Sequence, residues 1–194
     1  MRIFIAFELP IAVVDALDKL QTALKRAGLK LAWVHPGNIH LTLKFLGDVK
    51  AEDLPRIECA LGDVSARHSA FALTARGLGV FPTVKKARVL WSGIHGDVLA
   101  LKKLHADLDL TLERIGFAPE TRSFRGHLTL GRMKGKTEAR TLAATVSEFG
   151  SFSSSSFVVD RLILFQSDLK PGGAEYTELA GVDLAGAPDR KYRP

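Results

Sequence analysis

Residues 38–47 read "NIHLTLKFLG", an apolar stretch that carries a histidine and a threonine two positions apart. Successive side chains of a β-strand point to opposite faces. His40 and Thr42 would therefore share one face, and the leucines between and after them would share the other. Because the leucine face can pack in a hydrophobic core, the stretch predicts a strand that presents its polar pair on the face away from that core.

The same four letters, "HLTL", return at residues 127–130, where His127 and Thr129 would again share one face of a strand. The two motifs stand about half a chain apart, and each lies within a similar succession of strands and helices. We therefore expect a duplicated strand-helix-strand-helix-strand unit within one bilobal domain, residues 1–194. The two repeats and the C-terminal strand and tail would cover residues 1–84, 85–170 and 171–194, respectively.

Hydrophobic periodicity and turn residues divide the chain into short strands and helices. The expected strands are residues 2–7, 31–34, 39–47, 70–80, 88–94, 127–132, 157–165 and 176–184. The expected helices are residues 11–27, 51–66, 97–115 and 137–148. The serine-rich segment 151–156 is expected to be a loop. No glycine-rich phosphate loop follows any expected strand, so the pattern favours an α+β fold with antiparallel sheets over a doubly wound nucleotide-binding fold.

The composition is that of an ordinary folded protein with a basic excess. Hydrophobic residues make up 46% of the chain and charged residues 25%, which excludes a disordered protein. The net charge of +6 is compatible with an RNA partner, although many small proteins are equally basic. The single cysteine, Cys59, excludes an intramolecular disulfide and a cysteine-based metal cluster. No apolar run reaches the length of a membrane span, and we expect a cytoplasmic monomer with no membrane partner.

Two histidine–threonine pairs that face one groove would suit chemistry at phosphorus. If the two lobes are related by a pseudo-two-fold axis, both pairs converge on the same groove. An imidazole has a pKa near 6.5, so one histidine can accept a proton while the other donates one. Threonine hydroxyls can donate hydrogen bonds to the non-bridging phosphate oxygens as charge develops. Because no set of residues with metal-ligand spacing accompanies the histidines, we expect neither a metal nor a cofactor.

The residues five positions after the two histidines differ. Arg132 follows His127 and offers a guanidinium fork that suits phosphate. Phe45 follows His40 and offers a face on which a nucleobase can stack, although phenylalanine is also a common core residue. The pattern indicates an asymmetric site, with phosphate held on one side and a nucleobase on the other.

Four segments resemble the 2H phosphoesterases, and among them the RNA 2′,3′-cyclic phosphodiesterases that are also known as 2′–5′ RNA ligases. These segments are "RIFIAFELP" near the N-terminus, "WVHPGNIHLTLKFLGDV", "FRGHLTLGR", and "YTELA" near the C-terminus. Together they extend over nearly the whole chain. The resemblance implies two pseudo-symmetric lobes, each an antiparallel sheet with helices on its outer face, and an active site in the cleft between them.

The resemblance also implies a catalytic histidine pair, two threonines and an arginine that bind phosphate, and a phenylalanine that stacks the terminal base. The histidine pair is His40 and His127, and the phosphate-binding residues are Thr42, Thr129 and Arg132. The phenylalanine that stacks the base is Phe45. The implied reaction is hydrolysis of RNA 2′,3′-cyclic phosphate ends to 2′-phosphates, with reversible 2′–5′ joining in some members. Since the 3′ oxygen then leaves, we expect His40 to protonate it and His127 to activate water. The near symmetry of the site leaves the opposite assignment open.

Two other functions stay open on the sequence. The same histidine pairs could act on a different phosphodiester, such as an ADP-ribose cyclic phosphate or a 2′–5′ oligoadenylate. A non-catalytic RNA-binding module would use the basic charge and Phe45, but it would not require two titratable histidines matched by two threonines. The expected partner is accordingly an RNA with a 2′,3′-cyclic phosphate end or a small cyclic nucleotide.

Overall fold

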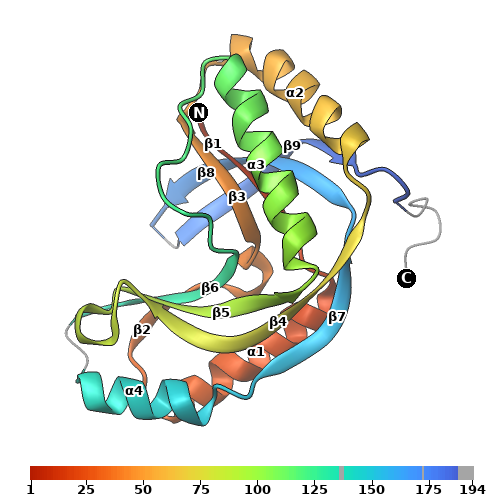
Figure 1. Cartoon of the computed structure of the whole chain (residues 1–194). Helices are drawn as coiled ribbons and strands as arrows, with labels where there is room; N and C mark the ends of the chain where they lie inside the picture. The colour runs from red at the N-terminus through yellow and green to blue at the C-terminus, as the bar shows by residue number, and fades with distance from the viewer. Residues whose placement is uncertain (136–137, 172, 188–194) are drawn as a thin grey trace.

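The computed structural model describes residues 1–135, 138–171 and 173–187, and Figure 1 shows how their helices and strands are arranged. The strands are β1 (Arg2–Phe7), β2 (Leu31–Trp33), β3 (Leu41–Asp48), β4 (Phe71–Phe81), β5 (Val89–Gly96), β6 (His127–Met133), β7 (Ser153–Val159), β8 (Arg161–Lys170) and β9 (Gly173–Asp183). The α-helices are α1 (Ile11–Arg26), α2 (Leu54–Arg67), α3 (Val98–Arg114) and α4 (Ala139–Glu148). Short 3₁₀ helices lie at Pro36–Asn38, Ala51–Asp53 and Val84–Lys86.

The strands form a single curled sheet in the order β7-β4-β5-β6-β3-β1-β8-β9, with β2 paired to β6. All of these strand pairs are antiparallel, which confirms the expected α+β class with antiparallel sheets. The two halves meet where Leu41 of β3 pairs with Leu128 of β6. From this junction outward the order β6-β5-β4-β7 corresponds to β3-β1-β8-β9. The two expected lobes therefore join in one continuous sheet.

One half of the sheet comes from the middle of the chain, and the other combines strands from its two ends. β4 lies within the first expected repeat yet pairs with β5 of the second, whereas β8 of the second repeat pairs with β1 of the first. The proposed sequence repeats over residues 1–84 and 85–170 stay a prediction. Within the expected C-terminal strand and tail, β9 is present, and residues 172 and 188–194 lie outside the described residues.

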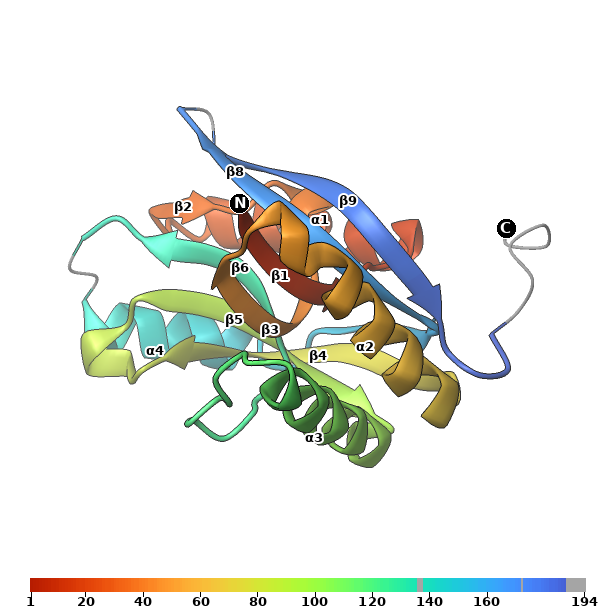
Figure 2. The same ribbon diagram turned by 90° about the horizontal axis from the view of Figure 1, so that it is seen from above.

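The helices cover the outer side of the curl, as Figures 1 and 2 show. α2 packs against α3 and against β8 and β9, while α1 contacts β7 and α4 contacts β4. Each helix buries an apolar face with helical spacing; in α1 this face contains Val13, Leu17, Leu20 and Leu24. None of the described helices combines the length and the apolar composition needed to cross a bilayer.

The core consists of a large cluster beneath the helices and a small aromatic cluster on the other face of the sheet. The leucines of both "HLTL" motifs belong to the large cluster, and none is more than 4% exposed. Phe4 and Phe165 belong to the small cluster, with Tyr176 packed against it. Both faces of β1 are therefore buried, and the motif leucines point away from the histidine face as the alternation predicted.

The expectation of a loop at residues 151–156 was wrong for most of that segment. Residues 153–156 begin β7, and the single strand expected over residues 157–165 is two strands, β7 and β8. β7 pairs with β4 at the edge of the sheet, where Ser154 Oγ accepts a hydrogen bond from the Ala75 N–H at 3.0 Å. Because the pairing is made by backbone groups and most of these serines face solvent, the low hydrophobicity of the segment does not prevent a strand.

Replacing Leu41 by alanine should destabilise the fold by about 2–5 kcal/mol, since Leu41 is 0% exposed at the junction of the two half-sheets. The free energy of unfolding from urea titrations measures the loss. The matched control is Leu99→Ala on α3, where the leucine is 64% exposed and a change within about 0.5 kcal/mol is expected. Equal losses in the two variants would contradict the role assigned to the junction.

Candidate active site

The junction of β3 and β6 brings the two motifs side by side. Leu41 and Leu128 are antiparallel partners, and extending this register by one residue on either side sets each histidine opposite the threonine of the other motif. The two histidines are then diagonal neighbours, about 7–8 Å apart in a regular sheet. A phosphate group fits between two imidazoles at such a separation, with a hydroxyl beside each of them.

A β-bulge in β3 places Phe45 on the same face as His40. Strict alternation would put a residue five positions after His40 on the opposite, buried face. Thr42 and Lys44 pair with successive residues of β1, which leaves Leu43 as the extra residue of the bulge. The extra residue reverses the alternation once. Phe45 is accordingly 70% exposed, whereas Lys44 is only 7% exposed.

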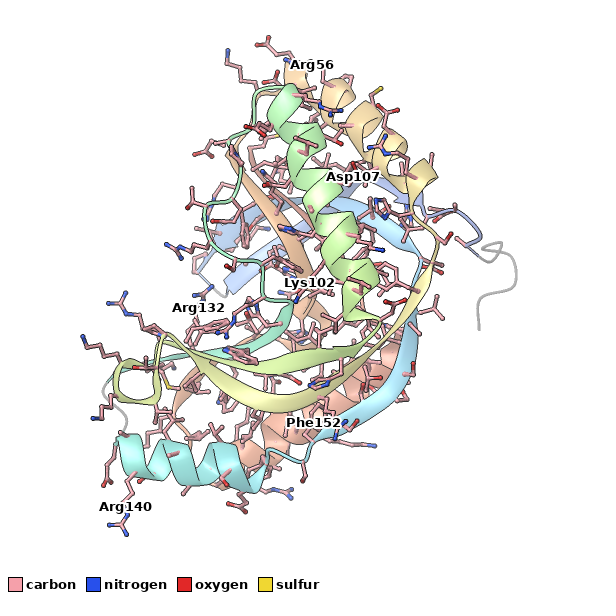
Figure 3. All side chains as sticks on the ribbon, in the orientation of Figure 1. Arg56, Lys102, Asp107, Arg132, Arg140 and Phe152 are labelled. Atoms are coloured by element: carbon pink, nitrogen blue, oxygen red, sulfur yellow. The ribbon has the colours of Figure 1, made fainter. Side chains whose placement is uncertain are left out.

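A second bulge at the corresponding place in β6 does the same for Arg132. Thr129 and Gly131 pair with successive residues of β5, which leaves Leu130 as the extra residue. Arg132 therefore joins His127 and Thr129 on the inner face of the sheet. Figure 3 shows Arg132 at the open side of the molecule, between the two halves of the sheet.

His40 is held by a backbone carbonyl. Its Nδ1 lies 2.8 Å from the Asn38 carbonyl oxygen. A carbonyl can only accept a hydrogen bond, so Nδ1 carries the hydrogen and Nε2 is left for a substrate. Asn38 is itself fixed, because its Nδ2 donates to the Ala174 carbonyl of β9 at 2.8 Å. The β8–β9 hairpin thus helps to orient the ring of His40.

His127 is held in the same way. Its Nδ1 lies 2.8 Å from the carbonyl oxygen of Arg125, again two residues before the histidine. The same argument places the hydrogen on Nδ1 and leaves Nε2 available. Both rings are therefore fixed in the same tautomer when neutral, and each presents the same nitrogen.

The surroundings of the two rings differ. His40 stacks on Phe4 at 4.8 Å between centroids and meets the edge of Tyr176 at 5.2 Å. His127 meets Phe81 edge-on at 5.0 Å, and its hydrogen bond to the Arg125 carbonyl is exposed to solvent, whereas that of His40 is partly buried. Water therefore has easier access to the second histidine.

Burial shifts the pKa of two groups on the His40 side. Desolvation lowers the pKa of His40 below its ordinary value of 6.5; the hydrogen bond to Asn38 opposes this shift, and the charge of His127 adds to it. Desolvation raises the pKa of Tyr176, and the positive charge of Arg132 opposes that rise. These couplings indicate that the two histidines, and likewise Tyr176 and Arg132, are close enough to interact electrostatically.

Five of the six predicted residues line one cavity of about 630 Å³. They are His40, Thr42, Phe45, Thr129 and Arg132. His127 does not line this cavity but a neighbouring one of about 540 Å³, and Thr42 and Phe45 line both. The predicted residues thus gather around two adjoining cavities that meet at Thr42 and Phe45.

Sequence reasoning did not single out several residues that line or support the first cavity. Tyr176 contacts His40, Asn38 fixes it, and Lys25 lies 5.4 Å from the ring of Trp33 in the cavity wall. Tyr176 begins the segment "YTELA", which was noted only as part of a resemblance. No periodicity in the chain points to the others, because their positions depend on the packing of β2 and β9 beside the motif strands.

Among the described residues, no group of three or more histidine, cysteine, aspartate or glutamate side chains is arranged to hold a metal ion. The side chains gathered at the site include two imidazoles, two hydroxyls, a guanidinium and a phenol.

The electrostatic coupling of the histidines predicts the effect of removing one. In His127→Gln, the pKa of His40 should rise, because the positive charge that opposes its protonation is gone. It should stay below 6.5, since desolvation, the larger cause, is unchanged. NMR titration of the ring protons measures both values, with His68→Gln as a control outside the cleft. An unchanged or lower His40 pKa would contradict the coupling.

The chain matches the family described as LigT like phosphoesterase over residues 8–91 and 98–176. A relative from Methanothermobacter thermautotrophicus, named RNA 2′,3′-cyclic phosphodiesterase, is 35% identical over 179 residues, which are 92% of this chain and 96% of the relative. A relative of the same name from Archaeoglobus fulgidus is 33% identical over 180 residues, 92% of this chain and 98% of the relative.

Two solved structures show the same fold. A crystal structure from Thermus thermophilus superposes with a TM-score of 0.78 at 28% identity, covering 96% of this chain and 99% of the other. Escherichia coli LigT in complex with phosphate superposes with a TM-score of 0.66 at 26% identity, covering 94% and 96%. The family match, the sequence identities and the shared fold agree, and the chain belongs to the LigT-like phosphoesterase family.

Proposed function

We propose that this protein hydrolyses RNA 2′,3′-cyclic phosphate ends to 2′-phosphates by acid–base catalysis between His40 and His127. The observation that carries the proposal is the matched pair of imidazoles. Each is held through Nδ1 by the carbonyl two residues earlier, each leaves Nε2 available, and the pairing of Leu41 with Leu128 sets each beside a threonine of the other motif. The names of the relatives support the substrate class, and the phosphate complex of Escherichia coli LigT supports an anion-binding site.

In this proposal the phosphate lies between the two histidines at the junction of the cavities. Thr42 and Thr129 donate hydrogen bonds to its non-bridging oxygens, and Arg132 adds a positive charge. The terminal base stacks on Phe45, which is 70% exposed and so has a free face. These contacts bind both the ground state and the developing negative charge, while the histidines move the protons.

The different solvent access of the two rings supports distinct roles. His127 lies where water can reach it, so it removes a proton from the attacking water. His40 lies in an aromatic setting beside the first cavity and protonates the leaving 3′ oxygen. A 5′-hydroxyl in place of water would give 2′–5′ joining by the same steps, which is how the protein would act as a reversible ligase.

The lowered pKa of His40 bears on this assignment. In the free protein, burial favours the neutral ring, which could not act as an acid. The bound phosphate is an anion close to the ring, and an opposite charge favours the protonated form. The acid role of His40 therefore depends on substrate binding to restore its proton.

The reaction is tested with an oligoribonucleotide that ends in a 2′,3′-cyclic phosphate, in excess EDTA. The wild-type protein should release a 2′-phosphate end, and His40→Ala and His127→Ala should each lose about 10²- to 10⁴-fold in rate. His68→Ala, whose histidine pairs with Asp107 on the helices, should retain activity. Full activity in either cleft variant would rule out the two-histidine mechanism, and loss of activity in EDTA would show that a metal is required.

The roles of the two histidines are separated by a substrate with sulfur in place of the bridging 3′ oxygen. A thiolate leaves without a proton, so the variant that lacks the acid should lose much less rate on this substrate than on the oxygen substrate. We expect this recovery in His40→Ala and not in His127→Ala, measured as the ratio of variant to wild-type rate on each substrate. Recovery in His127→Ala alone would reverse the assignment.

A further inference from the structure

The cavities beside the proposed phosphate position extend beyond the second one. The second cavity continues into a third, of about 300 Å³, and the two share Phe81, Phe124, Arg125 and His127 in their walls. The third cavity reaches α3, where Lys102 lines it. Figure 3 shows Lys102 on α3, and its side chain is exposed. Three adjoining cavities thus lead from His40, past His127, to α3.

The walls of the second and third cavities carry a positive charge that the proposed reaction does not use. Arg122 and Arg125 line the second cavity, and Arg125 and Lys102 line the third. Within the described part of the chain, no ion pair is found for any of the three side chains. Glu120 also lines the second cavity and is the acidic group there. The balance along this stretch favours an anionic ligand.

The loop between α3 and β6, residues 115–126, is held in place by contacts with Lys44 and Asp109. Lys44 forms an ion pair with Asp109 of α3 and donates a hydrogen bond to the Ala118 carbonyl at 2.8 Å. Asp109 also accepts a hydrogen bond from the Glu120 N–H at 3.2 Å. Because Lys44 is 7% exposed, this pair is shielded from solvent and fixes the loop that forms the cavity wall.

Phe124 is also fixed. His105 stacks on one face of its ring, with 3.9 Å between centroids and an angle of 18° between planes. Phe124 lines both the second and the third cavity, next to Arg125. The cavity walls therefore combine an aromatic ring with cationic side chains, a combination that suits single-stranded nucleic acids, since bases stack on rings while phosphates meet the cations.

We propose that the second and third cavities bind the nucleotides upstream of the cyclic phosphate, so that the preferred substrate is an RNA strand and not a cyclic mononucleotide. This inference rests on the proposed function. A cyclic phosphate terminates the strand, so any further nucleotide lies on its 5′ side. The terminal base occupies the first cavity at Phe45, and the chain runs past Phe124 towards Lys102.

The test compares a 2′,3′-cyclic mononucleotide with di- and tetraribonucleotides that end in the same cyclic nucleotide. The wild-type kcat/KM should rise with length. The ratio of the tetranucleotide value to the mononucleotide value should fall in Lys102→Gln and Arg122→Gln, and by roughly fivefold or more in Phe124→Ala, through lost stacking. The matched control is Arg140→Gln, which removes the same charge from α4, on the far side of the sheet in Figure 3, and should leave the ratio unchanged.

Salt dependence gives a second readout that a merely structural effect would not produce. Each lost phosphate contact should reduce the slope of log Kd against log salt by about 0.7. This is measured by fluorescence anisotropy with a labelled tetraribonucleotide that ends in a 2′-phosphate. Lys102→Gln and Arg122→Gln should each reduce the slope, and Arg140→Gln should not.

The outcomes separate this inference from the proposed function. If the cyclic mononucleotide is hydrolysed and added length brings no gain in kcat/KM, the proposed binding of upstream nucleotides is overturned. The proposed hydrolysis is then unaffected. If no substrate is hydrolysed, the proposed hydrolysis is overturned. The anisotropy measurements then test the binding of upstream nucleotides by themselves. An equal loss of slope in Arg140→Gln would show a general charge effect and would also overturn the binding of upstream nucleotides.

Discussion

A one-residue bulge, present at the same place in β3 and β6, determines which side chains enter the cleft. The leucines at positions 41 and 128 are fully buried, and they fix the register of the two strands at their junction. Without the bulges, strict alternation would turn Phe45 and Arg132 towards the core and leave the lysine at position 44 on the face of the histidines. Each bulge reverses the alternation once, so a histidine and the residue five positions after it lie on the same face.

The two halves of the site share a backbone arrangement and differ in their surroundings. Both histidines are anchored to a carbonyl two residues earlier, which is a local property of each strand entry. The aromatic cluster behind His40 comes from β1, β8 and β9, whereas His127 is backed by Phe81 and Trp91 from β4 and β5. A nearly symmetric frame thereby holds two rings in different surroundings.

The sequence predicted the strands that carry the motifs because their leucines alternate with polar residues and are buried by neighbouring helices. It did not predict the first part of β7, residues 153–156, because serines at a sheet edge contribute backbone pairing and little hydrophobicity. Tyr176 and Asn38 were missed for a different reason. Their positions depend on how the β8–β9 hairpin folds over the first motif, and no local pattern encodes that contact. The assignment of the two histidines to separate cavities is likewise a consequence of tertiary packing.

The residue that follows each bulge explains why the two cavities have different walls. In β6 it is Gly131, where a Cβ atom would lie 3.2 Å from the Ala32 carbonyl oxygen, so glycine allows β2 to pair closely with β6. β2 then brings Trp33 into the wall of the first cavity.

In β3 the equivalent residue is Lys44, and among the strands of the described residues none is added there. Its ion pair with Asp109 instead holds the loop before β6, which forms the wall of the second cavity. One position in a common frame thus serves two purposes, since a small residue admits a strand and a buried cation fixes a loop. The different walls of the two cavities therefore follow from having glycine at this position in β6 and lysine in β3.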